Sequence, residues 1–339
     1  MENITSMNSQ VEIANPNEAI SVIHFLHPPI TIFGIIMNTW TTLTLISGKV
    51  KISPTTRIYY LVISIADLNI VVCSFFVIVT CESVAAWTNG RASFCPNIMS
   101  LFTCIIMLLW IILAEFVSNY ALVALSIERL IAVYWPLRAK VILTKKFTYY
   151  LLFFILGPVS LYTAILISFG AVIVPTPGPL SPSSCSIDNN RIFGYLFNIS
   201  IPVIYLGIHT IVDLIVSLML FFKVYLHHKP DLNKKSRKSS KELSATLTLI
   251  FLCIITLIVY GTSLVAFVTT LIFQYFVTVP IELSTLMFQI FMRLMTFTTV
   301  PHSLNIFVYF ALIPTFRQVA LCGLCKAKLE TSTSSALTQ

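Results

Sequence analysis

The sequence has few charged residues for its length. Asp, Glu, Lys and Arg make up 10% of the 339 residues, and 57% of the chain is hydrophobic. Soluble domains carry about 25% charged residues. So small a charged fraction excludes an ordinary soluble globular protein and indicates that lipid is the solvent of this chain.

Motifs of the common enzyme and metal-site classes are also missing. The chain has no glycine-rich phosphate loop and no His-Glu-x-x-His sequence, and no Cys-x-x-Cys pair is accompanied by histidines at metal-ligand spacing. We also expect no buried histidine–carboxylate cluster. The polar N-terminus does not resemble a cleavable signal peptide, so the first membrane helix is expected to act as the insertion signal. The sequence therefore predicts that the protein is not an enzyme.

Long apolar stretches dominate what remains. Seven of them meet the requirement of about 20 mostly apolar residues for a spanning helix, and they cover residues 22–47, 57–83, 97–133, 147–173, 193–226, 243–273 and 283–312. No internal repeat is present, which argues against a transporter built from two equal halves. We predict an all-α membrane protein with three parts: an extracellular N-terminus (1–21), a seven-transmembrane helix bundle (22–312), and a cytoplasmic helix and tail (313–339).

Basic residues are distributed unevenly between the two sides of this predicted bundle. Of the 21 lysines and arginines, all except Arg91, Arg191 and Arg293 lie in the odd-numbered linkers or the C-terminal tail. By the positive-inside rule, this bias predicts an N-terminus outside and a C-terminus in the cytoplasm. It also assigns the net charge of +8 to anionic membrane lipids and cytoplasmic partners rather than to nucleic acid.

Two sequons agree with this orientation. Asn3 and Asn198 each begin an Asn-x-Ser/Thr triplet on the predicted outer side. Asn3 is the stronger candidate for glycosylation, because Asn198 lies close to a predicted membrane span.

A charged motif stands at the inner end of the third apolar stretch. Glu128-Arg129-Leu130 is followed by Pro136-Leu137. An arginine at a helix end inside a bundle needs a partner, and Glu128 can hold it in a resting state. The motif resembles the Asp/Glu-Arg-Tyr signature of rhodopsin-like (class A) G-protein-coupled receptors, with Leu130 in place of the usual tyrosine. The resemblance implies that Arg129, once released, contacts a G protein.

A second motif lies in the last stretch. Asn305 and Tyr309 are four residues apart and share a helix face. They resemble the Asn-Pro-x-x-Tyr motif of the same family, with Ile306 in place of proline. The run of residues before Asn305 is similar to that of invertebrate neuropeptide (FMRFamide-like) receptors. The resemblance assigns Asn305 and Tyr309 to activation, together with Glu128 and Arg129.

A third family-like element is the carboxylate of Asp67 in the second stretch. A carboxylate at this depth must face polar groups or water. The resemblance implies a cluster of Asp67 with Asn38, Asn305 and Ser118 or its neighbour Asn119. Such a cluster either holds a sodium ion or forms a purely structural polar network.

The resemblance also implies covalent features on both sides of the membrane. Cys185 in the second outer loop is expected to form a disulfide with Cys104 or with Cys95. Cys104 matches the family spacing to Arg129, while a tryptophan motif in the first outer loop favours Cys95. Residues after Tyr309 resemble a short amphipathic eighth helix. Two cysteines near its end, Cys322 and Cys325, are palmitoylation candidates or free thiols.

The resemblance is thinner in the fourth to sixth stretches. The fourth has no tryptophan, the fifth lacks the usual proline in its middle, and the sixth lacks both the Trp and the Pro of the family motif. A helix-six activation hinge is therefore not implied by the sequence, and neither is the identity of a ligand.

Ionisable residues within the stretches are candidates for ligand contact. The candidates are Glu115, Arg293 and Glu282, and Asp213 is a further charged residue, in the fifth stretch. Either Glu115 receives a basic group of the ligand, or Glu115 and Arg293 form an internal salt bridge.

The predicted function is that of a plasma-membrane receptor for a peptide. Its expected partners are a heterotrimeric G protein, arrestin, receptor kinases and membrane lipids. Alternative functions are an orphan chemoreceptor for small molecules and, less favoured, a channel or transporter.

Overall fold

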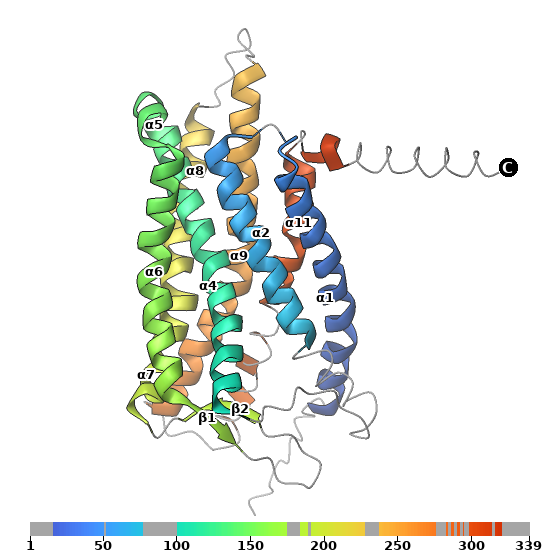
Figure 1. The fold of residues 1–339 in the computed structure, drawn as a ribbon, viewed down its shortest axis with the longest axis vertical. Helices are drawn as coiled ribbons and strands as arrows, with labels where there is room; N and C mark the ends of the chain where they lie inside the picture. The colour runs from blue at the N-terminus through green and yellow to red at the C-terminus, as the bar shows by residue number, and fades with distance from the viewer. Residues whose placement is uncertain are drawn as a thin grey trace, which may run out of the picture.

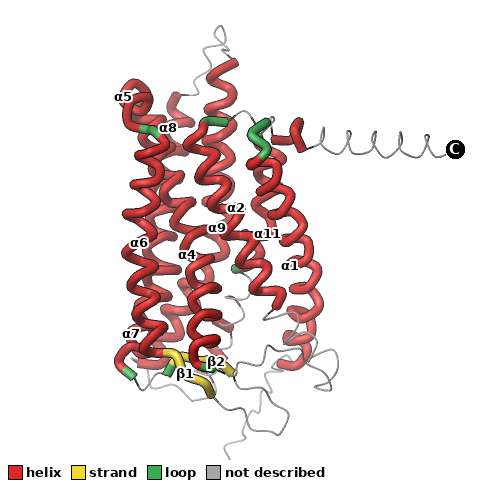
Figure 2. The backbone as a smooth tube through the Cα atoms, in the orientation of Figure 1, coloured by secondary structure: helices red, strands yellow, loops and turns green. Residues whose placement is uncertain are grey.

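The computed structural model describes residues 16–50, 52–76, 100–174, 184–188, 191–227, 237–275, 283, 286–287, 290–291, 294, 298–313 and 316–320. Long helices run side by side along the long axis, and two short strands lie at one end (Figures 1 and 2). In chain order the elements are α1 (Pro16–Ile46), α2 (Pro54–Ser74), α4 (Leu101–Tyr134), α5 (Pro136–Ile142), α6 (Lys145–Gly170), β1 (Ala171–Val174), β2 (Ser184–Ile187), α7 (Ile192–Pro202), a π-helical segment (Val203–Ile208), α8 (His209–His227), α9 (Arg237–Tyr275) and α11 (Thr299–Leu312).

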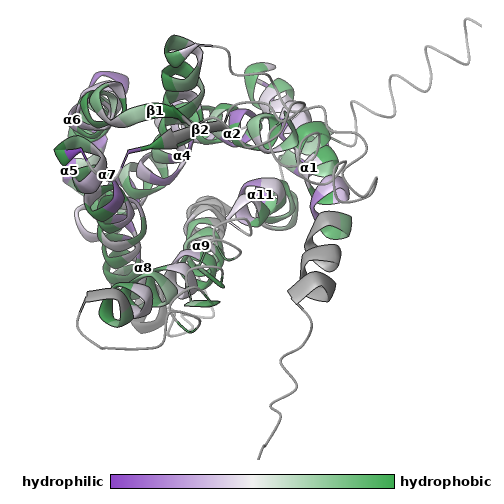
Figure 3. Ribbon diagram, turned by 90° about the horizontal axis from the view of Figure 1, so that it is seen from below, coloured by the Kyte–Doolittle hydropathy of each residue, from purple (hydrophilic) through white to green (hydrophobic). Residues whose placement is uncertain are grey.

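Six helices of the described chain are long and apolar enough to cross a membrane. They cover Phe25–Ile46, Pro54–Ser74, Leu101–Tyr134, Lys145–Gly170, Ile192–Lys223 and Leu249–Phe273. Large hydrophobic side chains point away from the protein along these helices, as Phe153 does with 69% of its surface exposed. Figure 3 shows hydrophobic residues on the helices all around the bundle. The chain is therefore a predominantly helical, multi-pass membrane protein.

The last predicted stretch, 283–312, is described in part. Its C-terminal portion is α11, and residues 283, 286–287, 290–291 and 294 are also helical. Residues 316–320 form a further short helical turn after α11.

Side-chain caps determine where three of the long helices begin. Ser53, Ser100 and Thr144 each accept a hydrogen bond from the backbone N–H three residues later, at 3.1, 3.2 and 3.2 Å. Such caps satisfy N–H groups that lack a partner within the helix. Pro54 follows the first of these caps, at a position where a missing N–H costs nothing. These caps place the starts of α2, α4 and α6 within four residues of the predicted 57, 97 and 147.

The fourth stretch ends earlier than its hydropathy predicts. Residues 171–174 form β1, which pairs antiparallel with β2 so that Ile173 stands opposite Cys185. The prediction that a membrane helix continues to residue 173 is wrong, because the β-branched run Val172-Ile173-Val174 favours a strand once a partner strand is available. The resulting hairpin packs against α4 at the end of the bundle where the strands lie.

A π-helical segment interrupts the fifth apolar stretch. It begins directly after Pro202, whose ring removes a backbone N–H donor from the helix. A π turn adds a residue to the helical repeat and rotates the following residues relative to the preceding ones. Tyr205 within the segment and His209 directly after it are both buried.

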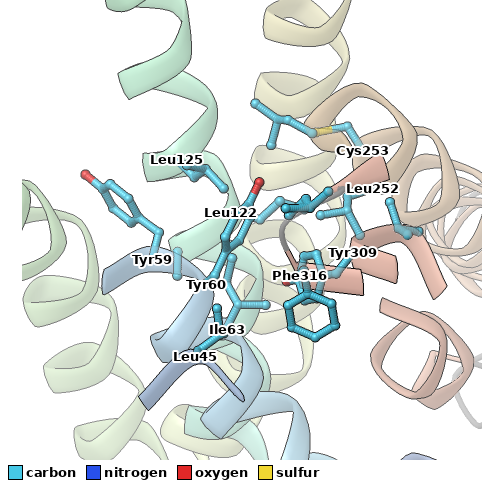
Figure 4. Packing of buried hydrophobic residues seen from close by; sticks show 14 of the residues in the cluster. Leu45, Tyr59, Tyr60, Ile63, Leu122, Leu125, Leu252, Cys253, Tyr309 and Phe316 are labelled. Atoms are coloured by element: carbon cyan, nitrogen blue, oxygen red, sulfur yellow. The ribbon is translucent and has the colours of Figure 1, made fainter. Parts of the chain in front are cut away.

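The apolar core lies where α2 and α11 pack against each other and against their neighbouring helices. α2 packs against α1 and α4, and α11 packs against α1, α2 and α9. Figure 4 shows side chains of this core, with Tyr60, Leu122 and Tyr309 among those labelled. The rings of Tyr60 and Tyr309 lie 4.9 Å apart, which joins α2 to α11.

A glycine allows α1 to approach both of its neighbours closely. A Cβ atom at Gly34 would lie 2.5 Å from Ser303 Oγ on α11 and 3.0 Å from a side-chain carbon of Val71 on α2. A side chain at this position would have to displace both of these neighbours.

Replacing Gly34→Ala is expected to destabilise the protein by about 1–3 kcal/mol, because the added methyl overpacks this contact. The measurement is the apparent melting temperature of the purified protein in detergent. Gly261→Ala is the matched control, since a Cβ at Gly261 meets no atom within 4 Å. That change is expected to leave stability unchanged or raise it by up to about 1 kcal/mol. Equal effects of the two substitutions would contradict the close approach at Gly34.

Candidate functional site

A fully buried carboxylate forms the centre of the site. Asp67 lies on the inward face of α2, in line with Tyr60, Ile63 and Ser64, and it has 0% exposed surface. Its Oδ1 accepts a 2.5 Å hydrogen bond from Ser118 Oγ on α4. Its Oδ2 accepts a 2.5 Å bond from Asn305 Nδ2 on α11. The fold thus brings Asp67, Ser118 and Asn305 together from three helices.

Asn38 lies one step away from this carboxylate. Its Nδ2 donates to the backbone carbonyl of His302 at 2.9 Å. Its own carbonyl accepts a 3.3 Å bond from Ser64 Oγ. Asn38 therefore joins α1 to α11 and α2, and its side-chain amide bonds His302 rather than Asp67.

The residue that sequence analysis missed is His302. Its Nδ1 lies 2.7 Å from Asp67 Oδ1, and both side chains are buried. The expectation of no buried histidine–carboxylate cluster is wrong. A signal was present, because His302 stands three residues before Asn305 and so shares its helix face. The family-like motif begins at Asn305 and therefore assigns no role to His302.

Two tyrosines continue the contacts of His302 toward the π-helical segment. Tyr260 OH on α9 lies 2.8 Å from His302 Nε2. Tyr205 OH donates to Tyr260 OH at 3.0 Å, and Asn119 Nδ2 donates to the same oxygen at 3.3 Å. Because all four side chains are buried, each polar atom needs such a partner.

Glu115 stands at the other end of this series. The residue as a whole is half-buried, and its carboxylate lies beside the hydroxyl of Tyr205. Its predicted alternative partner, Arg293, and the further ligand candidate Glu282 lie outside the described residues. The Glu115–Arg293 salt bridge therefore stays a prediction.

Near the C-terminal end of α4, the charged motif contacts α2. Glu128 is buried, and its Oε1 accepts a 2.9 Å hydrogen bond from Thr55 Oγ1. Arg129 Nη2 donates to the hydroxyl of Thr56. Within the described chain, Glu128 and Arg129 form no ion pair with each other. Thr56 of α2, which sequence analysis also missed, takes the place expected of Glu128 as the partner of Arg129.

Tyr309 on α11 contacts α2 through its aromatic ring. Its ring lies 4.9 Å from that of Tyr60 and 6.1 Å from that of Phe316, which precedes the C-terminal tail (Figure 4). The C-terminal half of α11 is therefore packed against α2 and against the start of the short 316–320 turn.

A second polar stripe lies on α8. His209, Asp213 and Ser217 are spaced four residues apart and thus share one helix face. His209 and Asp213 are buried, and neither Asp213 oxygen has a hydrogen-bond partner among the described residues. The free, buried Cys253 on α9 lies 3.6 Å from Ser126 Oγ in the same region. Sequence analysis noted the charge of Asp213 and assigned it no role.

The end of the bundle with the hairpin carries a disulfide. Cys104 is fully buried at the start of α4 and is disulfide-bonded. Its Sγ lies 3.7 Å from the backbone oxygen of Val172 on β1. The side chain of Cys185 and all of Cys95 lie outside the described residues, so the pairing of Cys104 stays a prediction.

Of the remaining predicted sites, one lies among the described residues and three do not. Asn198 is exposed on α7. The other glycosylation candidate and the two lipidation candidates lie outside the described residues: Asn3, Cys322 and Cys325.

The Asp67 cluster does not fit the sodium ion that the family resemblance implies. A hard cation needs oxygen lone pairs directed at it. Both oxygens of Asp67 already accept hydrogen bonds, and two of the donors are nitrogen atoms, from His302 and Asn305. The cavity beside them, lined in part by Ser118 and Tyr260, has a volume of about 10 Å³, which is room for about one water.

Removing one hydroxyl tests the polar series. Tyr260→Phe leaves His302 Nε2 and the donors of Tyr205 and Asn119 without their shared partner. It is expected to destabilise the protein by about 1–3 kcal/mol, measured as a lower melting temperature of the purified protein. Tyr149→Phe on the exposed face of α6 is the control and is expected to have no effect. An unchanged melting temperature for Tyr260→Phe would show that these contacts do not contribute to stability.

The disulfide has its own test. Non-reducing peptide mapping of the purified protein is expected to recover a cross-linked peptide that contains Cys104 and Cys185. The reason is that β2, which carries Cys185, pairs with the strand against which Cys104 packs. Cys95 is expected to be alkylated. A Cys95–Cys185 peptide would contradict this pairing.

Comparison with known proteins gives no assignment: no protein-family model matches the chain, and no curated protein is similar to it in sequence.

Proposed function

We propose that this protein is a divergent rhodopsin-like G-protein-coupled receptor of the plasma membrane. In this proposal the bundle has seven spanning helices, with the N-terminus outside and the basic linkers in the cytoplasm. The observation that carries the proposal is that α2 contacts the motif residues of two other helices. Asp67 on α2 binds Asn305 of α11, and Thr56 on the same helix binds Arg129 of α4.

This geometry supports a defined resting state. Arg129 is held against α2 by Thr56, and the Glu128 carboxylate beside it is held by Thr55. Both contacts join α4 to the first turn of α2, so a relative movement of these helices would release the two charges together. Release of Arg129 toward the cytoplasm would then make it available to a G protein.

A peptide is the proposed ligand class. Glu115 lies 14 residues before Arg129, which is about 21 Å along a helix at 1.5 Å per residue. A carboxylate at that depth suits a basic group of a ligand that enters from the outer side. Its neighbour Tyr205 belongs to the π-helical segment, a type of distortion that is frequent at functional sites.

Substitution of the inner contacts tests the proposed function. Arg129→Ala is expected to abolish G-protein activation, because it removes the side chain that would contact the G protein. Thr56→Val is expected to raise agonist-free activation several-fold, because it releases Arg129 from α2. Nucleotide exchange on a panel of G proteins in membranes is the measurement, with amidated peptides screened as candidate agonists.

Thr39→Val is the matched control. Thr39 is exposed on α1, and its hydroxyl bonds only its own helix, to the Ile35 carbonyl at 2.7 Å. This variant is expected to behave like the unmodified receptor. Full activation by Arg129→Ala at equal surface expression would overturn the proposal.

A further inference from the structure

Asp67 is surrounded by donor side chains of the protein itself. We propose that the imidazole of His302 occupies the place of a sodium ion, and that it connects Asp67 through Tyr260 and Tyr205 to the outer half of the bundle. The site would accordingly bind no sodium ion. A series of directed hydrogen bonds would stabilise the carboxylate in its place.

The acceptor capacity of the carboxylate supports the first part. Oδ1 accepts from Ser118 at 2.5 Å and faces His302 Nδ1 at 2.7 Å, while Oδ2 accepts from Asn305 at 2.5 Å. Nitrogen donors direct hydrogen atoms, not lone pairs, toward the carboxylate. A sodium ion at Asp67 would have to displace both the imidazole and the amide before it found oxygen ligands.

The hydrogen-bond directions follow from the partners. Nδ1 of His302 faces a carboxylate oxygen, which only accepts, so this nitrogen carries a hydrogen. The Tyr260 oxygen accepts from Tyr205 and from Asn119, so its own hydrogen is free to point to His302 Nε2. Every hydroxyl and ring hydrogen in the series then points the same way, from Tyr205 to Tyr260, to His302, to Asp67.

The backbone holds the imidazole in this position. The carbonyl of His302 accepts from Asn38 Nδ2 at 2.9 Å, which ties it to α1. The next residue, Ser303, lies against Gly34 of α1. His302 is 2% exposed, so its ring has no alternative orientation toward solvent.

The series ends next to Glu115, whose carboxylate lies beside the Tyr205 hydroxyl. Tyr205 has one hydrogen to donate, to Tyr260 or to Glu115. A ligand group that binds Glu115 would therefore change whether Tyr205 donates to Glu115 or to Tyr260. Through Tyr260 and His302, this change would reach the hydrogen bonds of Asp67. This last step rests on the proposed function, whereas the replacement of sodium does not.

The test measures sodium binding without a G protein. The full chain is purified and reconstituted in lipid nanodiscs, and its melting temperature is compared in about 150 mM NaCl and about 150 mM choline chloride, near physiological ionic strength. Radioactive sodium binding is measured on the same samples. The unmodified protein is expected to bind no sodium saturably and to melt at the same temperature in both salts.

His302→Ser supplies the positive arm. It exposes Asp67 Oδ1, adds a hydroxyl oxygen, and enlarges the small cavity next to the ring. We expect this variant to bind sodium saturably and to melt roughly 3–6 °C higher in NaCl than in choline chloride, since a ligand of the folded state stabilises it. Adding Asp67→Asn to His302→Ser is expected to remove both effects.

Two outcomes would overturn the proposal. One is saturable sodium binding by the unmodified protein that Asp67→Asn abolishes. The other is a folded His302→Ser variant that shows no sodium effect. If that variant does not fold, the binding measurement on the unmodified protein still decides the proposal. Loss of the Arg129 phenotype would bear only on the receptor function, so the two failures are distinguishable.

Discussion

A carboxylate buried in the apolar interior of a membrane bundle is stable only if donors surround it. Asp67 meets this requirement with Ser118, His302 and Asn305, which come from α4 and α11. These bonds determine how α2, α4 and α11 are rotated against one another, because any other rotation would leave the charge unpaired. The further contacts of His302 carry the same constraint to α1 and α9.

Two regions of different character result from this arrangement. Near the N-terminal end of α2, its threonines hold Glu128 and Arg129, while aromatic rings of Tyr60, Tyr309 and Phe316 pack together. On the other side of Asp67, the tyrosine series leads to Glu115 and the π-helical segment. A change of rotation at Asp67 would therefore affect both regions together.

The sequence and the structure agree best where a single segment contains all the information. Hydropathy alone located the long helices, and serine and threonine caps explain the small shifts at their starts. The fourth stretch was predicted too long, because the β-branched residues 171–174 are apolar enough for a membrane helix and become a strand only when β2 pairs with them. The family-like motifs pointed to Asp67, Ser118 and Asn305, yet they gave no role to His302 or Thr56, which depart from the motif or lie outside it.

By itself, the sequence determined that this is an integral membrane protein. It also determined the positions of the apolar helices and the charged residues within them. These properties depend on composition and on periodicity along neighbouring residues. Only the tertiary structure decided what each buried charge contacts. Asp67 and its partners His302 and Asn305 are 235 and 238 residues apart in the chain, so their meeting depends on the rotation and packing of whole helices. The contact of His302 with Asp67 is therefore a property of the fold, because no local pattern contains both groups.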